Sequence, residues 1–380
     1  MQFVIDRTKL QEAVSDVLKA VSSKTTIPIL TGIKITASHE GIQLIGSDSN
    51  ISIERFIPLE ENDEVLIELK QPGSIVLQGR YLSEIVKKLP SDQVEMTVVD
   101  RLVTKITSSS SEFNLNGLDP EEYPRLMQID GQHSFQIQAD LLQQIIRQTV
   151  FAVSTSETRP VLTGVNWKCE NETLTCTATD SHRLAMKQIT IQNEHSDISF
   201  SNVVIPGKSL NELSKIIDEK DEPVDVVITD HHILFKTRYV LFYSRLLDGS
   251  FPETSRLIPT ESKTTIVLST KELLQAIERA SVLAREEQNN VVKLISIDDR
   301  KLEIFSNSAE IGQVFEQLET ESFNGEELKI SFSAKYMMEA LKAIDSSKIM
   351  IDFTGAMRPF IIRPIGDDSQ LQLILPVRTY

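Results

Sequence analysis

The sequence predicts an α+β protein that consists of three copies of one small domain, each with two helices packed on antiparallel sheets. Three landmarks recur in the same order along the 380 residues, at steps of 127 to 132 residues. The period is far longer than the roughly 20–50 residues of a solenoid repeat, so each copy is large enough to be a domain. The landmarks are Leu10, Leu142 and Leu274; Asp48-Ser49-Asn50, Asp180-Ser181-His182 and Asn307-Ser308-Ala309; and Gly79-Arg80-Tyr81-Leu82, Gly207-Lys208-Ser209-Leu210 and Ala334-Lys335-Tyr336-Met337.

The domain limits follow from this repeat. A chain of this length is typical of two or three domains, and the repeat selects three. We expect domains over residues 1–128, 129–257 and 258–380, with boundaries near 127–131 and 257–262.

The first copy shows the expected elements most clearly. Leu10, Val14, Val17, Leu18 and Val21 recur at helical spacing and form one apolar stripe. Neighbouring segments alternate between apolar and polar residues, which is typical of half-buried strands. The elements are a strand over 3–5, a helix over 7–24, a hairpin over 31–45 that turns at 38–41, a helix over 80–88 closed by Pro90, and strands over 94–99 and 102–106. Helices with a single apolar stripe beside such strands are expected together on one side of the sheets.

Charge differs between the helices and the rest of the chain. In the second copy the sequence predicts helices over 140–150 and 208–217, and in the third copy over 271–285 and 335–343. The six helical segments together carry a net charge of +7, although the whole chain carries −16. This distribution indicates a basic surface on an acidic body. Helices that merely favour Lys and Arg would give the same count, so charge alone leaves both readings open.

Cysteine usage and hydropathy bear on the compartment. Cys169 and Cys176 lie on the two strands of one expected hairpin that turns at 170–173, so both thiols should be buried and free. No apolar run approaches the roughly 20 residues of a membrane span, and the first residues lack the pattern of a signal peptide. We expect a cytoplasmic protein.

Two motifs resemble catalytic or nucleotide sites without completing them. Gly207-Lys208-Ser209 could end a phosphate-binding loop, but that loop needs a glycine at position 202, which is Asn202. Asp180-Ser181-His182 contains the residue types of a catalytic triad, yet adjacent residues cannot adopt the triad geometry. None of the six histidines stands at a recognised metal-ligand spacing. We therefore expect no enzyme activity, cofactor or metal.

Basic residues follow the first helix in two copies. Lys24 and Arg159 occupy equivalent places and could reach DNA phosphates, which carry no sequence information. A partner for the helix dipole is the alternative for either residue alone.

Apolar residues also stand at unusual places. The chain end is apolar at Leu371, Leu373 and Leu375, which predicts either a sheet strand or one wall of a groove for an apolar peptide. Two apolar pairs, Phe113 with Leu115 and Val282 with Leu283, could meet in a second copy of the chain, or could be ordinary core.

The repeat also suggests how copies associate. Three like domains placed end to end form an arc if each junction turns the same way, with the basic helical side inside. The ends of the arc would expose strand edges, which proteins generally cover or pair. Two arcs could then close into a ring through a two-fold axis.

Four motifs resemble the beta subunit of bacterial DNA polymerase III, the replication sliding clamp family. In order they are Thr26-Ile27-Pro28-Ile29-Leu30, Thr179-Asp180-Ser181-His182-Arg183-Leu184, Asp248-Gly249-Ser250-Phe251-Pro252 and Leu375-Pro376-Val377-Arg378. The resemblance spans the whole chain. It implies DNA-clamp domains that form half of a closed ring, a head-to-tail homodimer around duplex DNA, and one groove per subunit for short peptides.

The resemblance also implies site residues. A peptide-binding groove is implied at Leu162, Thr179, Ser181, His182, Arg183, Leu184, Pro252, Arg256, Leu257, Pro359, Leu375, Pro376, Val377 and Arg378. Lys24 and Arg159 match DNA-facing positions, and the charge pattern adds Arg80, Lys87, Arg147, Lys208, Lys215 and Lys342 on the helices. Phe113, Leu115, Val282 and Leu283 match the apolar part of the dimer junction.

The predicted function is processivity without chemistry. The ring would hold a polymerase on duplex DNA without sequence specificity. Its peptide partners would be the polymerase III alpha subunit, clamp-loader subunits and repair proteins, with no membrane involved. A weakly basic inner surface suits sliding, because many phosphate contacts would bind DNA too firmly. The alternatives are a monomeric three-domain scaffold that binds peptides but no DNA and, less favoured, an enzyme that uses Gly207-Lys208-Ser209.

Overall fold

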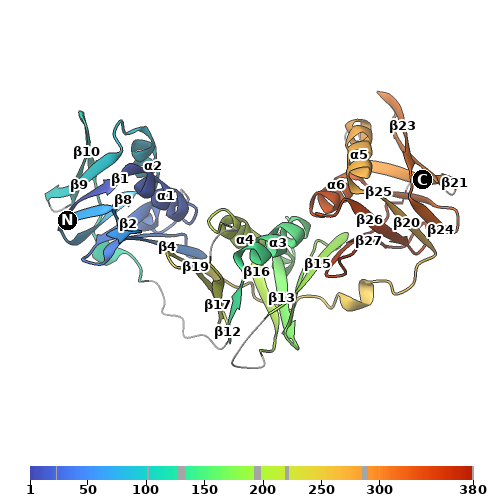
Figure 1. Ribbon diagram of the computed structural model, residues 1–380, viewed down its shortest axis with the longest axis horizontal. Helices are drawn as coiled ribbons and strands as arrows, with labels where there is room; N and C mark the ends of the chain where they lie inside the picture. The colour runs from blue at the N-terminus through green and yellow to red at the C-terminus, as the bar shows by residue number, and fades with distance from the viewer. Residues whose placement is uncertain are drawn as a thin grey trace. The chain divides into compact units, whose positions relative to one another are not determined.

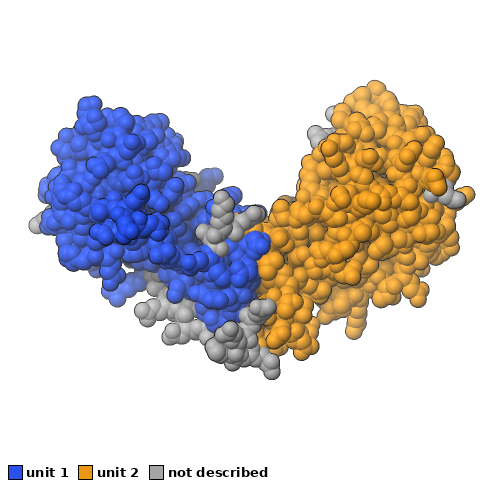
Figure 2. Space-filling model, viewed as in Figure 1, with its two compact units in different colours: residues 1–140, 211–246 blue, residues 141–210, 247–380 orange. Residues whose placement is uncertain are grey.

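The computed structural model of the protein (Figure 1) describes residues 1–22, 24–100, 102–125, 133–191, 198–218, 222–284, 290–298 and 300–378. The chain forms two compact units (Figure 2). Unit 1 comprises residues 1–140 and 211–246, and unit 2 comprises residues 141–210 and 247–380.

Unit 1 contains the whole first repeat and four strands of the second. Its elements are β1 (Gln2–Asp6), α1 (Arg7–Leu18), η1 (Pro28–Thr31), β2 (Gly32–Ala37), β3 (Gly41–Ser47), β4 (Ile51–Pro58), β5 (Glu60–Glu61), β6 (Glu64–Val65), β7 (Ile67–Gln71), β8 (Gly73–Gln78), α2 (Gly79–Lys88), β9 (Gln93–Asp100), β10 (Val103–Ser108), β11 (Ser111–Asn116), η2 (Pro120–Glu122), β12 (His133–Ile137), β17 (Val224–Ile228), β18 (His232–Lys236) and β19 (Val240–Arg245).

These strands form two main antiparallel sheets. One has the order β11-β10-β9-β1-β7, and the other has the order β12-β17-β18-β19-β4-β3-β2-β8. Helices α1 and α2 contact each other, and α1 also packs on β3 and β4 (Figure 1). Leu10 and Val14 of α1, Leu82 of α2 and Ile33 of β2 are fully buried, because each helix turns its single apolar stripe toward the strands.

Unit 2 contains the third repeat and the remaining strands of the second. Its elements are η3 (Val150–Ala152), η4 (Pro160–Thr163), β13 (Gly164–Glu170), β14 (Thr173–Thr179), β15 (Arg183–Thr190), β16 (Phe200–Pro206), η5 (Ser255–Leu257), β20 (Thr264–Ser269), α5 (Thr270–Ala284), β21 (Val291–Asp298), β22 (Lys301–Ser308), β23 (Gly312–Glu319), β24 (Ser322–Gly325), β25 (Lys329–Ser333), α6 (Ala334–Lys342), β26 (Lys348–Phe353), β27 (Phe360–Pro364) and β28 (Gln370–Ile374). Helices α3 (Ala139–Thr149) and α4 (Gly207–Ser214) cross the division between the units.

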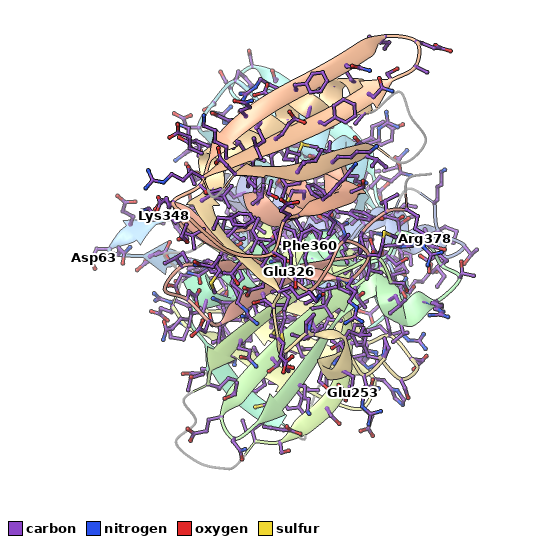
Figure 3. The ribbon with its side chains drawn as sticks, turned by 90° about the vertical axis from the view of Figure 1, so that its right-hand side faces the viewer. Asp63, Glu253, Glu326, Lys348, Phe360 and Arg378 are labelled. Carbon is purple, nitrogen blue, oxygen red and sulfur yellow. The ribbon has the colours of Figure 1, made fainter. Side chains whose placement is uncertain are left out.

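The sheets of unit 2 follow the same scheme. One has the order β16-β13-β14-β15-β28-β27-β26-β20-β24, and the other has the order β23-β22-β21-β25. Helix α5 packs on α6, β22 and β23. Phe332, Phe353 and Phe360 are fully buried in the core between these elements, and the ring centroid of Phe360 lies 5.5 Å from that of Phe332 and 5.1 Å from that of Phe353. Figure 3 marks Phe360 in this interior.

The predicted α+β class and the threefold repeat are confirmed. Each repeat runs strand, helix, a run of strands, helix and three strands, beginning at β1, β12 and β20; among the described residues, the run between the two helices has seven strands in the first repeat, four in the second and five in the third. The hairpin turns of the first two repeats agree in atomic detail. The Asp48 carboxylate accepts bonds from the backbone N–H groups of Asn50 and Ile51, and the Asp180 carboxylate accepts from His182 and Arg183.

The third repeat departs from this turn. Ser49 and Ser181 have φ values of 77° and 78°, whereas Asn307 and Ser308 still belong to strand β22. The matching hairpin therefore turns two residues later, at residues 309–311, so the sequence landmark marks the end of the strand and not the same turn.

Two helices end earlier than predicted. Helix α1 ends at Leu18 instead of residue 24, because the N–H groups of Lys19, Ala20 and Val21 bond three residues back in a tighter turn. Helix α4 ends at Ser214 instead of residue 217, because the N–H groups of Lys215 and Ile216 bond three residues back in a tighter turn.

The two cysteines are free and buried on β13 and β14, as predicted. Burial raises the pKa of both thiols, and it raises the pKa of Cys176 well above the ordinary value. Within the described ranges, no helix is long and apolar enough to cross a bilayer.

Candidate peptide groove, charged helices and strand edges

An apolar cluster lies on unit 2 where β15, β27 and β28 run side by side. Its buried members are Leu184, Ile361, Leu371 and Leu373, with Met186, Ile258 and Leu375 packed against them. We call these seven residues the outer apolar cluster. Two of them, Leu184 and Leu375, belong to the predicted groove, and they are 191 residues apart in the chain. The pairing of β15 with β28 brings them together.

Arg183 precedes Leu184 on β15, so its side chain points to the opposite face of the sheet. It is 7% exposed and makes charge-assisted bonds to the carboxylates of Asp180, at 3.1 Å, and of Glu339. It also donates to the carbonyl oxygen of Phe151 at 2.5 Å. Its guanidinium carbon lies 4.5 Å from the ring centroid of Tyr336. Arg183 therefore supports the candidate groove from behind instead of lining it.

The same network holds the turn before β15. The Thr179 hydroxyl donates to the carbonyl of Arg183 at 2.6 Å, and the carbonyl of His182 accepts from the backbone N–H of Leu375 at 2.9 Å. The ring of His182 is exposed and its centroid lies 6.5 Å from that of Tyr336, a phenol whose pKa is raised by burial. The turn and the chain end are thus adjacent.

The remaining predicted groove residues also lie in unit 2. Leu162 is buried in η4, Pro359 is half-buried and accepts a bond from the Thr354 hydroxyl, and Leu257 is 54% exposed next to Ile258 of the outer apolar cluster. The other members fall into two groups by exposure. Ser181, Pro252, Arg256 and Arg378 are exposed, and Pro376 and Val377 are half-buried. Figure 3 shows Arg378 at the surface.

Sequence reasoning missed Met186, Ile258 and Glu339. Met186 stands two residues after Leu184 and so shares its face of the strand, a signal that was available. Glu339 is 156 residues from Arg183, and no local pattern indicates their ion pair.

Replacing Arg183→Met is expected to lower the free energy of unfolding of unit 2 by about 3 kcal/mol, because removing one partner leaves charges without their counter-ion. Urea denaturation followed by circular dichroism measures this change. Arg256→Met, which alters an exposed arginine in the same unit, should change stability by less than about 0.5 kcal/mol. Equal stability of the Arg183 variant and the wild type would contradict the structural role of the ion pair.

The eight predicted DNA-facing residues are all exposed. They are Lys24, Arg80, Lys87, Arg147, Arg159, Lys208, Lys215 and Lys342. Acidic neighbours partly neutralise three of them. Arg147 pairs with Asp345 at 2.6 Å, Lys215 with Glu212 at 2.8 Å and Lys342 with Glu278 at 2.9 Å. Glu212 and Glu278 are already included in the net charge of +7, so only Asp345 adds a neutralising charge from outside the predicted helical segments.

The predicted dimer residues lie at sheet edges or close to them. Phe113 is 38% exposed and Leu115 is half-buried on β11, which ends the five-stranded sheet. Val282 is 63% exposed and Leu283 is half-buried on α5, which packs on the edge strand β23. Phe113 stands opposite the buried Ile106, so it points to the helix side of its sheet.

Two strand pairs join consecutive repeats within the chain. In unit 1 the last strand of the second repeat, β19, pairs with β4 of the first, and Phe242 lies opposite Ile53. In unit 2 the last strand of the third repeat, β28, pairs with β15 of the second, and Gln372 lies opposite Ala185. Both pairs are antiparallel, and they correspond strand for strand: β19 matches β28, and β4 matches β15. The same kind of junction therefore occurs twice.

The position where a phosphate-binding loop needs glycine has a structural role instead. The Asn202 side chain, at the position where a phosphate loop needs glycine, donates to the carbonyl of Gly249 and accepts from the backbone N–H of Phe251. Among the residues that the structure describes, no group of three or more His, Cys, Asp or Glu side chains could hold a metal ion.

A thrice-repeated α+β domain whose copies share sheets through equivalent strands defines the DNA-clamp class of protein. The sequence matches three family models along its length: the DNA polymerase III beta subunit N-terminal domain over residues 1–127, its central domain over 136–253 and its C-terminal domain over 255–378. The chain belongs to the DNA polymerase III beta subunit family.

Individual relatives agree with this assignment. The chain is 60% identical to the beta sliding clamp of Bacillus subtilis and 56% identical to that of Halalkalibacterium halodurans, in both cases over all of both chains. The crystal structure of the Bacillus subtilis clamp superposes with a TM-score of 0.95 over the full length of both chains. The Pseudomonas aeruginosa clamp bound to griselimycin, 26% identical, superposes with a TM-score of 0.91, again over all of both chains. This membership confirms the prediction of a sliding clamp and not an enzyme.

Proposed function

We propose that two copies of this chain close head to tail into a ring around duplex DNA, and that the ring keeps a DNA polymerase on its template. Each copy contributes three clamp domains, at about residues 1–128, 129–257 and 258–380. The ring acts in the cytoplasm, where the bacterial chromosome lies. The observation that carries the proposal is a strand junction that occurs twice. The last strand of one repeat, β19 or β28, pairs with the corresponding strand of the repeat before it, β4 or β15.

The two internal junctions use β19 with β4 and β28 with β15, and a third junction of the same kind can form between two copies. Strand β11 is the last strand of the first repeat, and β23 is the third repeat's counterpart of β4 and β15; both are edge strands of their sheets. Open edges favour pairing with another chain. If the register of the internal junctions is kept, Phe113 of one copy lies opposite Val314 of the other, and Val282 and Leu283 on α5 cover Phe113 and Leu115. A two-fold axis then makes two identical junctions.

The charged helices support the DNA part of the proposal. The eight exposed basic residues are carried by helices or by the segments that follow them, and three of them share their charge with acidic neighbours. A small number of contacts to phosphates gives weak attraction without sequence preference. Such attraction permits the ring to slide.

The outer apolar cluster supports the peptide part of the proposal. It is flanked by the exposed His182 and Leu257 and by the half-buried Pro376 and Val377. An apolar site with a few polar groups around it suits a short peptide with apolar anchors. The proteins proposed to contain such peptides are the polymerase III alpha subunit, clamp-loader subunits and repair proteins.

Sedimentation equilibrium separates this proposal from a monomeric peptide-binding scaffold. At micromolar concentration we expect a mass of twice the chain mass of 42.8 kDa. A strict monomer over the same concentration range would favour the scaffold and contradict the ring.

A further inference from the structure

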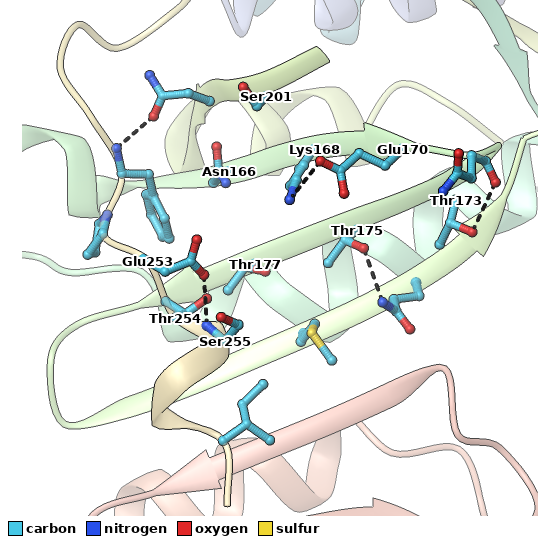
Figure 4. A pocket seen from close by; sticks show the side chains of 17 residues that line it. Asn166, Lys168, Glu170, Thr173, Thr175, Thr177, Ser201, Glu253, Thr254 and Ser255 are labelled. Carbon is cyan, nitrogen blue, oxygen red and sulfur yellow. Dashed lines mark hydrogen bonds and ion pairs between the residues drawn. The ribbon is translucent and has the colours of Figure 1, made fainter. Parts of the chain in front are cut away.

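A polar trough of about 710 Å³ lies beside the outer apolar cluster in unit 2 (Figure 4). Its floor is one face of β16, β13, β14 and β15, and its wall is the segment over 251–258. Met186 and Ile258 line this trough and also pack in the outer apolar cluster. The trough and the candidate groove are therefore one continuous surface.

The strand register shows how the two parts connect. Asn166 lies opposite Thr177, Thr177 opposite Met186, and Met186 opposite Leu371. Residues opposite one another in neighbouring strands point to the same face. One row thus runs from the polar floor of the trough into the apolar cluster. Strands lie about 4.8 Å apart, so Asn166 and Met186 are separated by about 10 Å, which about three extended residues span.

The wall of the trough is held in place. The Asn202 side chain donates to the carbonyl of Gly249 at 2.9 Å and accepts from the backbone N–H of Phe251 at 2.7 Å. The Glu253 carboxylate accepts from the backbone N–H of Ser255 at 3.0 Å. A wall fixed in this way reduces the ordering cost when a ligand binds.

The lining favours a neutral ligand that forms hydrogen bonds. Hydroxyl and amide groups form most of the floor, and Lys168 already pairs with Glu170 at 3.0 Å. Glu253 adds negative charge at the wall, which disfavours an acidic ligand. Among the described residues, the side-chain oxygen of Asn166 has no hydrogen-bond partner. A buried acceptor without a donor is costly, and a small turn of this amide toward a ligand donor removes that cost.

We infer that this trough binds the polar segment that flanks the apolar anchor of a partner peptide, through uncharged side chains such as Ser, Thr and Asn. The inference rests on the proposed peptide groove, because the anchor must occupy the outer apolar cluster for its flank to reach Asn166 and Thr177. The trough then selects among partners that share the same anchor.

The test compares peptides with and without a polar flank. The core probe is a fluorescein-labelled apolar pentapeptide of Leu, Phe and Ala. Two further probes add Ser-Asn-Thr at the amino or the carboxyl end, and two controls add Ala-Ala-Ala. Fluorescence polarisation with the full chain should show one polar extension binding about ten-fold more tightly than the core, the gain of one or two hydrogen bonds. The alanine extensions should bind like the core.

A double variant, Asn166→Leu with Thr177→Val, keeps the side-chain sizes and removes the polar groups. It should bind the core probe as the wild type does and lose the ten-fold gain. Thr190→Val, an exposed position of β15 outside the trough, should keep the gain. Equal binding of core and extended probes to the wild type would overturn the trough while leaving the groove intact. Failure of the core probe to bind at all would overturn the groove, and the inference with it.

Discussion

A chain that carries both Val282→Asp and Leu283→Asp is expected to sediment as a single copy at concentrations where the wild type forms a pair. Val282 is 63% exposed in one copy, so a carboxylate there is well hydrated until the proposed junction buries it. Burying unpaired charges in an apolar contact costs several kcal/mol. The dissociation constant of each junction should rise by at least about 1,000-fold, or about 4 kcal/mol.

Val65→Asp is a matched control, because Val65 on β6 is 69% exposed and lies outside the proposed junction. This variant should still form pairs. Phe113→Asp should separate the copies as the double variant does, since it alters the other side of the same contact. A pair of unchanged mass after the substitutions at 282 and 283 would exclude this junction.

Mixing the two separated variants distinguishes head-to-tail pairing from a symmetric contact. A pair formed by one Phe113→Asp chain and one Val282→Asp, Leu283→Asp chain has one junction damaged on both sides and one junction unaltered. The mixture should therefore form pairs through a single junction, although each variant alone does not. Such an open pair should not stay on circular DNA.

Truncation after Leu375 is expected to abolish binding of an apolar peptide while the protein stays folded. The deletion removes residues 376–380, which follow β28, and leaves Leu375 in the outer apolar cluster. The main loss to the fold is the bond from the backbone N–H of Val377 to the carbonyl of Ser331, at about 1 kcal/mol. The groove, in contrast, loses one of its proposed walls.

A fluorescence-polarisation titration with the apolar pentapeptide measures this loss, and sedimentation provides the control. The truncated chain should still form pairs, because the deleted residues lie outside the proposed dimer junction. Retained affinity for the peptide would show that the chain end does not line the groove.

Local patterns were sufficient to predict most elements of the fold. The apolar stripe of α1 and the alternation that surrounds the turn at 38–41 depend on neighbours in sequence, and both appear where expected. The end of α1 was predicted six residues too late, because the chain tightens into bonds three residues back after Leu18 while the apolar spacing continues to Val21. Periodicity carries no information about such a change of bonding.

Contacts between distant segments were not predictable in the same way. The ion pair between Arg183 and Glu339 joins β15 to α6, and the sequence does not indicate which repeats share a sheet. The family resemblance placed Arg183 in the groove, whereas strand alternation turns its side chain to the other face. The polar row of Asn166 and Thr177 also looked like an ordinary solvent-exposed strand face, since only the register connects it to Met186.

Retention on circular against linear DNA tests the proposed ring most directly. The protein is loaded onto a nicked circular plasmid by clamp-loader activity, and the complex is separated from free protein by gel filtration. We predict that the protein stays with the circle, even in salt that screens phosphate contacts, and is released when a restriction enzyme linearises the plasmid. Equal retention before and after linearisation would mean that the protein is held by surface contacts, and would contradict a ring around the DNA.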